Sequence, residues 1–233
     1  MNNLTISLLL LSSLVISSCN EEDPGPRQSD SRTYSIMDFD RIEAGDALII
    51  NIKQGTNFSI QADGDRRNLD DLMVYKNRST LVLRYEHYEK RNYNTSIVIT
   101  LPTLSGSDFS GAVNAQISGF MDINEFDLAL SGASLAQLDL EVTELNFVLS
   151  GASQLRLTGK GEAVIGTLTG ASLFSAFTYP SSQAKLIVSG ASNAKVSVSQ
   201  ALEVNASGAS LVLYRGNPQL EVEASGESIV KQE

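Results

Sequence analysis

The four residues Ser-Gly-Ala-Ser, with small variations, recur seven times from residue 110 onward. The copies begin at Ser110, Ser131, Ser150, Thr169, Ser189, Ser207 and Ser225. Their glycines lie 21, 19, 19, 20, 18 and 18 residues apart. A unit of this length cannot bury an apolar face alone. A regular repeat of it therefore predicts a solenoid in which each unit packs against its neighbours.

Apolar residues occupy every second position on both sides of each glycine. Around Gly132 they are Phe126, Leu128 and Leu130 before it and Ala136, Leu138 and Leu140 after it. A period of two with one buried face indicates strands and not helices. Each repeat therefore supplies at least two strands that meet at the glycine, and the pattern leaves the number of strands per coil open.

The repeated glycines are interpreted as structural corners. They are Gly111, Gly132, Gly151, Gly170, Gly190, Gly208 and Gly226. Glycine adopts positive φ without a Cβ penalty, so it can turn the chain between strands. We expect the alanine to fill the inside of the bend, and the serines to bond to nearby backbone or to a serine one coil away. The repeat lacks the Asn-Gly and Asp-Gly pairs of tight hairpins, which favours parallel coils of right-handed sense.

The sequence therefore predicts an all-β fold, a right-handed parallel β-helix-like solenoid with about 19 residues per coil. Residues 33–100 show five to seven short strand patterns without a repeat, and residues 66–71 could form one helical turn. We expect this region to be made of irregular coils that cap one end of the stack. At the other end, Glu221, Glu223, Lys231 and Glu233 carry charges that would discourage edge-to-edge pairing.

The N-terminal segment predicts export and a lipid anchor. The apolar run of residues 4–16 is too short to span a bilayer and resembles the core of a signal peptide. It ends in Ile16-Ser17-Ser18-Cys19, which resembles the bacterial lipobox, in which the cysteine becomes lipidated after cleavage. We therefore expect a signal peptide at 1–18, lipidation of Cys19, and an acidic disordered linker at 19–32. The alternative is an ordinary secretory signal with an incidental cysteine.

The charge of the chain indicates which partners and which cellular location to expect. The net charge of −10 argues against nucleic acid as a partner. The acidic run of residues 20–23 resembles an export tag of surface lipoproteins in some Gram-negative lineages. We expect a cell-envelope, outer membrane lipoprotein that is exposed at the surface and held to the membrane by its N-terminal lipid.

Several segments together resemble a known family, the putative auto-transporter adhesins with a head GIN domain, also called domain of unknown function 2807. Besides the Ser-Gly-Ala copies, the matching segments are Phe39–Ile42 with Gly45, Ile49–Gly55, Ile60–Asp65, Thr80–Leu83 and Ile99–Pro102. The resemblance implies a right-handed β-helix-like fold in a lipoprotein or secreted setting, and the family name implies adhesion. Residues 33–100 would be the N-terminal β region of this domain and residues 101–233 its repetitive coils.

The residues indicate no enzyme, cofactor or metal site. His87 is the only histidine, Cys19 is assigned to the lipid, and no serine lies in a Gly-x-Ser-x-Gly motif. Asp63-Gly64-Asp65, with Asp70 and Asp71, resembles a calcium loop, but Arg67 and Val74 occupy two positions that would need oxygen ligands. A carbohydrate-active enzyme remains an alternative, because several carboxylates fall on adjacent coils: Asp122, Glu125, Asp139, Glu141 and Glu144. A structural spacer is a further alternative.

A binding surface is expected where the repeat is interrupted. The segment of residues 84–93 mixes tyrosines with basic residues in an acidic protein, and such mixtures are common at recognition sites. The candidate residues are Tyr85, His87, Tyr88, Arg91 and Tyr93, together with Tyr179 in a second break. The alternative for this segment is a long hairpin tip whose tyrosines cover the end of the core. The expected ligand is a glycan or an extracellular protein, and the oligomeric state is left open.

Overall fold

The structure is a computed structural model that describes residues 25–233. The predicted signal peptide at 1–18, Cys19 and the linker residues 20–24 lie outside the described residues. Within the described part, no helix has the length and apolar character needed to cross a membrane.

The N-terminal third consists of short strands and one short helix. Its elements are β1 (Ser29–Tyr34), β2 (Arg41–Ala44), β3 (Ile49–Gln54), β4 (Ser59–Asp65), α1 (Arg66–Asp71), β5 (Leu72–Asn77), β6 (Thr80–Tyr85), β7 (Ser96–Leu101) and β8 (Gly106–Phe109). The predicted helical turn is confirmed as α1. The Asp65 side chain caps it by accepting a hydrogen bond from the Arg67 amide.

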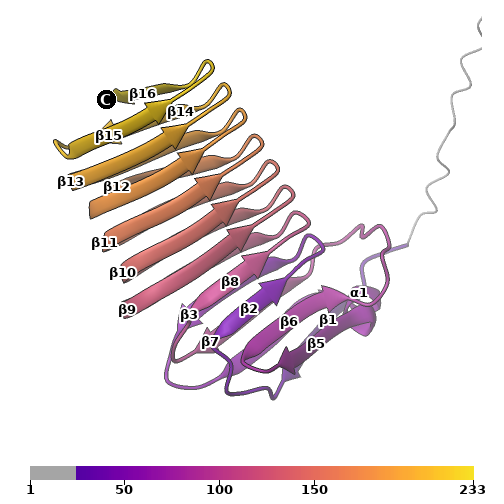
Figure 1. Cartoon of the computed structure of the whole chain (residues 1–233). Helices are drawn as coiled ribbons and strands as arrows, with labels where there is room; N and C mark the ends of the chain where they lie inside the picture. The colour runs from indigo at the N-terminus through magenta and orange to yellow at the C-terminus, as the bar shows by residue number, and fades with distance from the viewer. Residues whose placement is uncertain (1–24) are drawn as a thin grey trace, which may run out of the picture.

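The rest of the chain winds as long strands. These are β9 (Asn114–Leu130), β10 (Leu135–Leu149), β11 (Gln154–Leu168), β12 (Leu173–Val188), β13 (Asn193–Ala206), β14 (Leu211–Arg215), β15 (Gln219–Ala224) and β16 (Ile229–Gln232). Neighbouring coils pair in parallel, as Figure 1 shows. The predicted all-β parallel solenoid is confirmed, with about seven turns of about 19 residues each.

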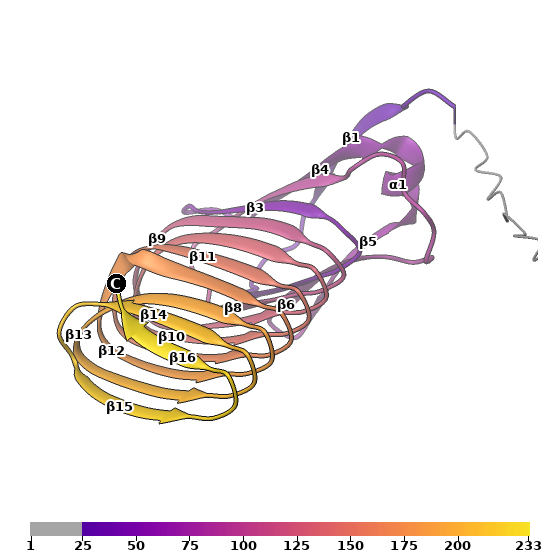
Figure 2. The ribbon, with the colours of Figure 1, turned by 90° about the horizontal axis from the view of Figure 1, so that it is seen from above.

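Each regular coil has two arms and two turning points. One turning point is the Ser-Gly-Ala-Ser corner, and the other is a bend where the register of the long strands shifts, as at Leu140 and between Ala176 and Pro180. We call the stretch between a corner and the next bend the first arm, and the stretch from that bend to the next corner the second arm. Seen along the stack, the arms form the two long walls of a flattened ring (Figure 2).

The corners need glycine for two reasons. All seven corner glycines have φ between 62° and 76°, a region that other residues rarely adopt. Stacked corners also approach closely: the Ala171 amide donates to the Gly151 carbonyl at 2.8 Å, and a Cβ on Gly170 would lie 2.5 Å from that oxygen. A side chain at this position would therefore collide with the coil below.

The alanine of the corner does not fill the inside of the bend, contrary to expectation. Ala133, Ala152 and Ala171 are exposed, whereas the serine that follows each of them is fully buried. The serine hydroxyl donates back across the corner, as from Ser153 to the Ser150 carbonyl at 2.7 Å. Since the glycine reverses the chain direction, the alanine points outward and the serine is the first residue of the inward series. Its hydroxyl group then satisfies a backbone acceptor that the turn leaves unpaired.

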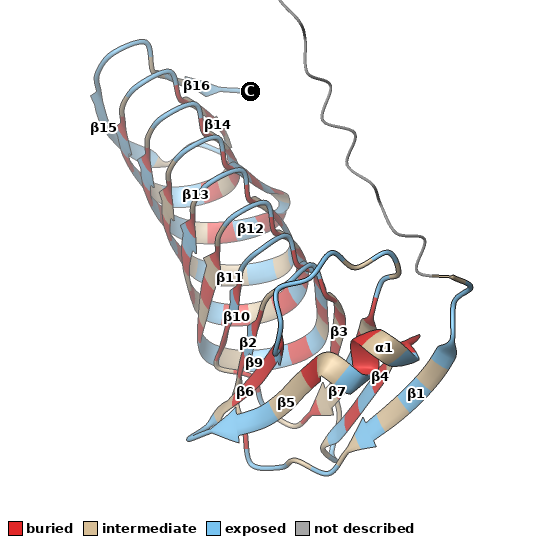
Figure 3. Ribbon diagram, turned by 90° about the vertical axis from the view of Figure 1, so that its right-hand side faces the viewer, coloured by how far each residue is buried: buried red, intermediate tan, exposed pale blue. Residues whose placement is uncertain are grey.

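The irregular strands do not stack in chain order. The coil made by β2 and β3 lies between two later coils, because β2 pairs with β6 and β8 while β3 pairs with β7 and β9. Antiparallel strands β1, β4 and β5, together with α1, lie at the end of the stack opposite β15 and β16 (Figure 3). Residues 29–77 therefore supply both an internal coil and most of the end cap.

The core is a continuous column of inward-facing aliphatic and aromatic side chains. Two glycines make room for large rings: Gly161 lies under Tyr179, and Gly166 lies under Phe147, whose ring centroid is 4.4 Å from that of Phe174. In the last coil, Leu220 and Val222 belong to the inward series but are 47% and 38% exposed. Within the described residues no further coil covers them, and Figure 3 shows this end in pale blue.

Candidate functional site

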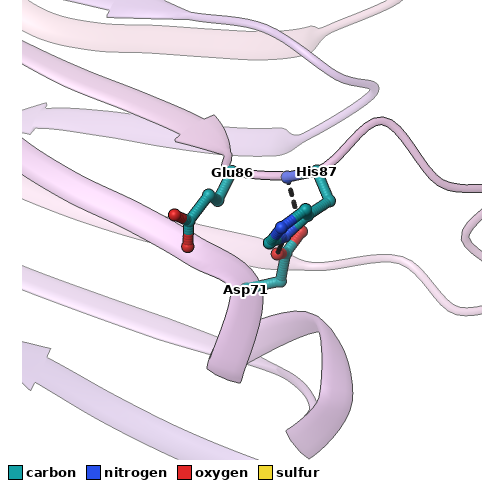
Figure 4. A group of neighbouring side chains, drawn as sticks. All are labelled: Asp71, Glu86 and His87. Carbon is teal, nitrogen blue, oxygen red and sulfur yellow. Dashed lines mark hydrogen bonds and ion pairs between the residues drawn. The ribbon is translucent and has the colours of Figure 1, made fainter.

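The candidate surface lies in the loop of residues 86–95, between β6 and β7, and Asp71 holds this loop in place. Asp71 is the last residue of α1. One carboxylate oxygen lies 2.5 Å from His87 Nδ1, and the other accepts hydrogen bonds from the His87 amide at 3.3 Å and from an Arg91 guanidinium nitrogen. Figure 4 shows the Asp71 and His87 side chains facing each other. One carboxylate thus ties two residues of the loop to the end of the helix.

In the cluster of Asp71, His87 and Arg91, the opposite charges of neighbouring groups favour each other's ionised form. Burial alone would raise the pKa of Asp71, but hydrogen bonds from His87 and Arg91 lower it below its ordinary value. The hydrogen bond to Asp71 in turn raises the pKa of His87 above 6.5. The Arg91 guanidinium also lies 4.2 Å from the centre of the Tyr85 ring. Arg91 therefore joins the carboxylate to the aromatic core under the loop.

Two of the expected surface tyrosines are buried. Tyr85 is 8% exposed, and its hydroxyl donates to Thr95 Oγ1 at 2.6 Å. Tyr179 is 1% exposed, its ring covers Gly161, its hydroxyl lies 3.3 Å from the Val142 carbonyl, and burial raises its pKa to about 12. Both tyrosines are buried for the same reason: they fall on inward positions, where a large ring fills the column and its hydroxyl finds an internal acceptor.

Of the other loop residues, Arg91 and Tyr93 hold the loop, Tyr88 is presented by it, and His87 both holds the loop and is exposed. Arg91 binds Asp71, while the Tyr93 hydroxyl donates to the Gly25 carbonyl at 2.9 Å and the Tyr93 carbonyl accepts from Asn68 at 2.7 Å. His87 is exposed, and Tyr88 is completely exposed. They border a groove of about 420 Å³ that also contacts the corner at Gly111.

The sequence did not indicate Asn68, and it indicated Asp71 only as part of the calcium-loop pattern that was set aside. Both lie near the end of α1, at least sixteen residues from their partners in the loop. Only the fold brings the helix and the loop together. The one sequence signal was the predicted helical turn at 66–71, because a turn of helix beside an irregular loop offers side chains to hold it.

A metal ion is a poor match for the same cluster. Among residues 25–233, Asp71, Glu86 and His87 place one ligand atom each within 4.8 Å of one another. However, both Asp71 oxygens already accept hydrogen bonds, one of them from a guanidinium cation that would repel a divalent ion. The geometry therefore favours a structural role for these residues.

The structure separates the carboxylates expected for a carbohydrate-active enzyme. Asp122 and Glu141 border a groove of about 620 Å³ along the bends, where Lys160 pairs with Glu141 at 3.2 Å. Glu125 and Glu144 are paired neighbours on the second arms, and Asn146 donates to both, at 3.0 and 3.2 Å. Asp139 lies on a first arm and accepts a hydrogen bond from Thr158 at 3.2 Å. Only two of the five thus border the groove.

The sequence of residues 38–218 matches the family model described as "Putative auto-transporter adhesin, head GIN domain". The match covers most of the chain and includes both the irregular coils and the regular repeat. The chain belongs to this family. The family name suggests a non-enzymatic protein of the cell surface. No curated protein sequence matches the chain.

Solved structures share the fold of this head GIN domain protein. A putative adhesin from Bacteroides fragilis has 20% identity and a TM-score of 0.80, over 89% of this chain and 98% of its own. A putative adhesin from Parabacteroides merdae has 15% identity and a TM-score of 0.70, over 88% and 96%. A protein from Parabacteroides distasonis described as a putative lipid binding protein has 16% identity and a TM-score of 0.69, over the same shares.

Proposed function

We propose that this chain is a non-enzymatic, lipid-anchored adhesin or binding protein of the outer membrane, displayed at the cell surface. The observation that carries the binding role is Tyr88, a completely exposed aromatic residue on a loop that Asp71 holds at two points. A fixed loop loses little conformational entropy on binding, so an aromatic residue presented this way is a favourable contact for a partner. Membership of the adhesin family supports the same role.

The position of the cap supports an anchored protein with its coils displayed. Gly25 binds Tyr93 at the cap end of the solenoid. Six residues of fully extended chain span at most about 20 Å, so a lipid on Cys19 would keep the cap close to the membrane. The regular coils would then extend away from the bilayer, where a partner could reach both of their walls.

The anchor is tested by replacing the proposed lipidation site. Cys19→Ala should move the protein from the membrane fraction to the soluble fraction and abolish palmitate labelling, because each buried methylene contributes about 0.8 kcal/mol to anchoring. Ser17→Ala keeps a small residue beside the cleavage site, so it should leave the membrane partitioning and the palmitate labelling unchanged. Membrane retention of the Cys19→Ala protein would contradict the lipid anchor.

The binding role is tested with the unlipidated chain of residues 20–233 on arrays of glycans and extracellular matrix proteins. We expect binding to some spots, and we expect Tyr88→Ala to weaken it by about tenfold or more, the effect of losing an aromatic contact. Tyr75→Ala is the matched control, because Tyr75 is also exposed but lies on β5. Uniformly blank spots would contradict binding and favour the spacer alternative.

A further inference from the structure

The outer wall formed by the first arms carries cations at regular intervals. Parallel pairing places Arg156, Ser175, Lys195, Leu213 and Lys231 side by side on β11, β12, β13, β14 and β16. Every second position in this row is therefore a cation. Because neighbouring strands lie about 4.8 Å apart, the cations recur about every 10 Å along the solenoid.

A second row beside it alternates between leucine and an amide from β10 to β14 and ends in isoleucine on β16. It runs Leu135, Gln154, Leu173, Asn193, Leu211 and Ile229 on successive coils. The coils of Arg156 and Lys195 therefore carry an amide, and the coils on either side of each carry leucine. The coil of Lys231 carries Ile229 instead. A hollow of about 240 Å³ lies between Leu173, Lys195 and Leu211. From β10 to β14 the wall thus alternates an apolar contact with a polar contact, and the polar contacts on β11 and β13 are positive.

An aromatic residue extends the same surface. The Arg215 guanidinium lies 4.1 Å from the centre of the Phe177 ring, and Lys195 Nζ lies 5.7 Å from it. Arg215 also pairs with Glu233 at 3.2 Å. We call the outward residues Arg156, Leu173, Phe177, Lys195, Leu211 and Lys231 the basic wall.

The opposite wall is acidic. The outward residues of the second arms include Glu125, Asp127, Glu144, Glu203, Glu221 and Glu223, with Lys185 among them. In a chain with a net charge of −10, the cations of the regular coils are therefore concentrated on one side. An anionic partner would be drawn to the basic wall and repelled by the other.

We propose that the basic wall binds a linear acidic polysaccharide that lies along the solenoid axis. An extended sugar ring is about as long as one strand spacing, so a disaccharide with one carboxylate spans two coils and matches the recurrence of Arg156, Lys195 and Lys231. The apolar C–H faces of the rings would pack on Leu173 and Leu211. Their hydroxyl groups would bond with the amides of the polar coils, which both donate and accept.

The wall suits a glycan better than an acidic peptide. The central strands of the wall are hydrogen-bonded on both sides, so they offer no free edge to an extended peptide backbone. A peptide laid across the leucines would leave its own amide groups without partners. The inference rests on the proposed binding role but uses a surface remote from the 86–95 loop, on the coils that extend away from the anchor.

The test measures binding of the unlipidated chain of residues 20–233 to immobilised hyaluronan, which has one carboxylate per disaccharide. We expect binding that weakens as salt is added, competition by a hexasaccharide but not by a disaccharide, and no binding to neutral dextran. The double substitution Arg156→Gln, Lys195→Gln should reduce affinity at least about tenfold, since it removes two charge-assisted contacts.

Controls separate this proposal from the alternatives. Lys185→Gln removes a cation from the acidic wall and should change affinity less than twofold, and each variant should keep its thermal midpoint. The proposal would be overturned if the double variant and Lys185→Gln lost affinity equally. It would also be overturned if the chain bound poly-glutamate as tightly as hyaluronan, or did not bind hyaluronan. Array binding that depends on Tyr88 but not on Arg156 and Lys195 would overturn it while leaving the proposed function intact. Arrays blank throughout would contradict both.

Discussion

At the scale of single residues, Asp71 decides how the 86–95 loop is held. Its carboxylate is largely buried and accepts hydrogen bonds from the imidazole of His87 and the guanidinium of Arg91. Neither bond is evident from sequence spacing, since sixteen and twenty residues separate the partners. The consequence is a loop whose tip residue, Tyr88, is exposed while its base is fixed.

The titration of His87 reports directly on this contact. The chain has one histidine, so its imidazole gives a single set of resonances. We expect a pKa above 6.5 in the native protein, and a return toward 6.5 in Asp71→Asn, which removes the charge that favours imidazolium. Glu89→Gln is the control and should change the pKa of His87 least, because Glu89 contributes least to raising it. NMR titration measures both, and a pKa unaffected by Asp71→Asn would show that the contact is not formed in solution.

The sign of the pH effect follows from this shift. Because the pKa of His87 is higher in the folded chain, the contact stabilises the loop fully below about pH 6.5 and is lost as pH rises through the raised pKa. Proteolysis of the loop should accordingly be faster at alkaline pH, and Asp71→Asn should abolish this dependence.

Tyr179 lies in a break of the repeat and yet belongs to the core. We expect Tyr179→Ala to destabilise the fold by about 3–5 kcal/mol, the range for a buried aromatic ring, because Gly161 below it cannot fill the space. Tyr179→Phe removes only the hydroxyl contact with Val142 and should cost about 1 kcal/mol. Urea unfolding measures both, and a small effect of the alanine variant would mean that the ring does not pack inside.

At the scale of the structural element, the corner combines a conformational and a steric requirement. Gly170 has φ of 76°, and its neighbour Ala171 donates to Gly151 one coil below. The outward alanine and the buried Ser172 complete the motif, with the hydroxyl bonded to the Thr169 carbonyl at 2.8 Å. Each corner is therefore a turn that also stacks on the next one.

Substitution of the glycine should be much more harmful than substitution of its neighbour. Gly170→Val imposes a strained φ and places a Cβ 2.5 Å from the Gly151 oxygen, so we expect a loss of about 2–4 kcal/mol. Ala171→Val projects into solvent and should change stability by no more than about 0.5 kcal/mol. If denaturant unfolding gave equal effects, the corner would not have the described geometry.

At the scale of the whole molecule, each coil is stabilised by its neighbours, so stability should vary along the stack. The coils of β10–β12 are covered on both sides, and the coil of β15 and β16 is covered on one side within the described residues. We expect amide hydrogen exchange to be slowest in β10–β12 and fastest in β15–β16, where Leu220 and Val222 are exposed. Uniform protection in this chain would indicate that something covers the last coil in solution.

The sequence by itself was sufficient for the repeat, the corners, the strand character of both arms and the turn of α1. These features depend on local rules: alternation with a period of two, and the conformational freedom of glycine. The same rules did not predict that Tyr85 and Tyr179 are buried. The series of inward-facing residues continues through the interruptions of the repeat, where a binding surface was expected.

Only the tertiary structure decided which side chains meet. Coiling brings Arg156 next to Ser175 and Ser175 next to Lys195, and it inserts the β2–β3 coil between coils made later in the chain. It also places Asp71 under the 86–95 loop. The physical reason is that the register between coils is set by the packing of the shared core and by parallel hydrogen bonding, both of which join residues far apart in the chain. The local pattern specifies a coil, and the stacking of coils decides which side chains share a surface.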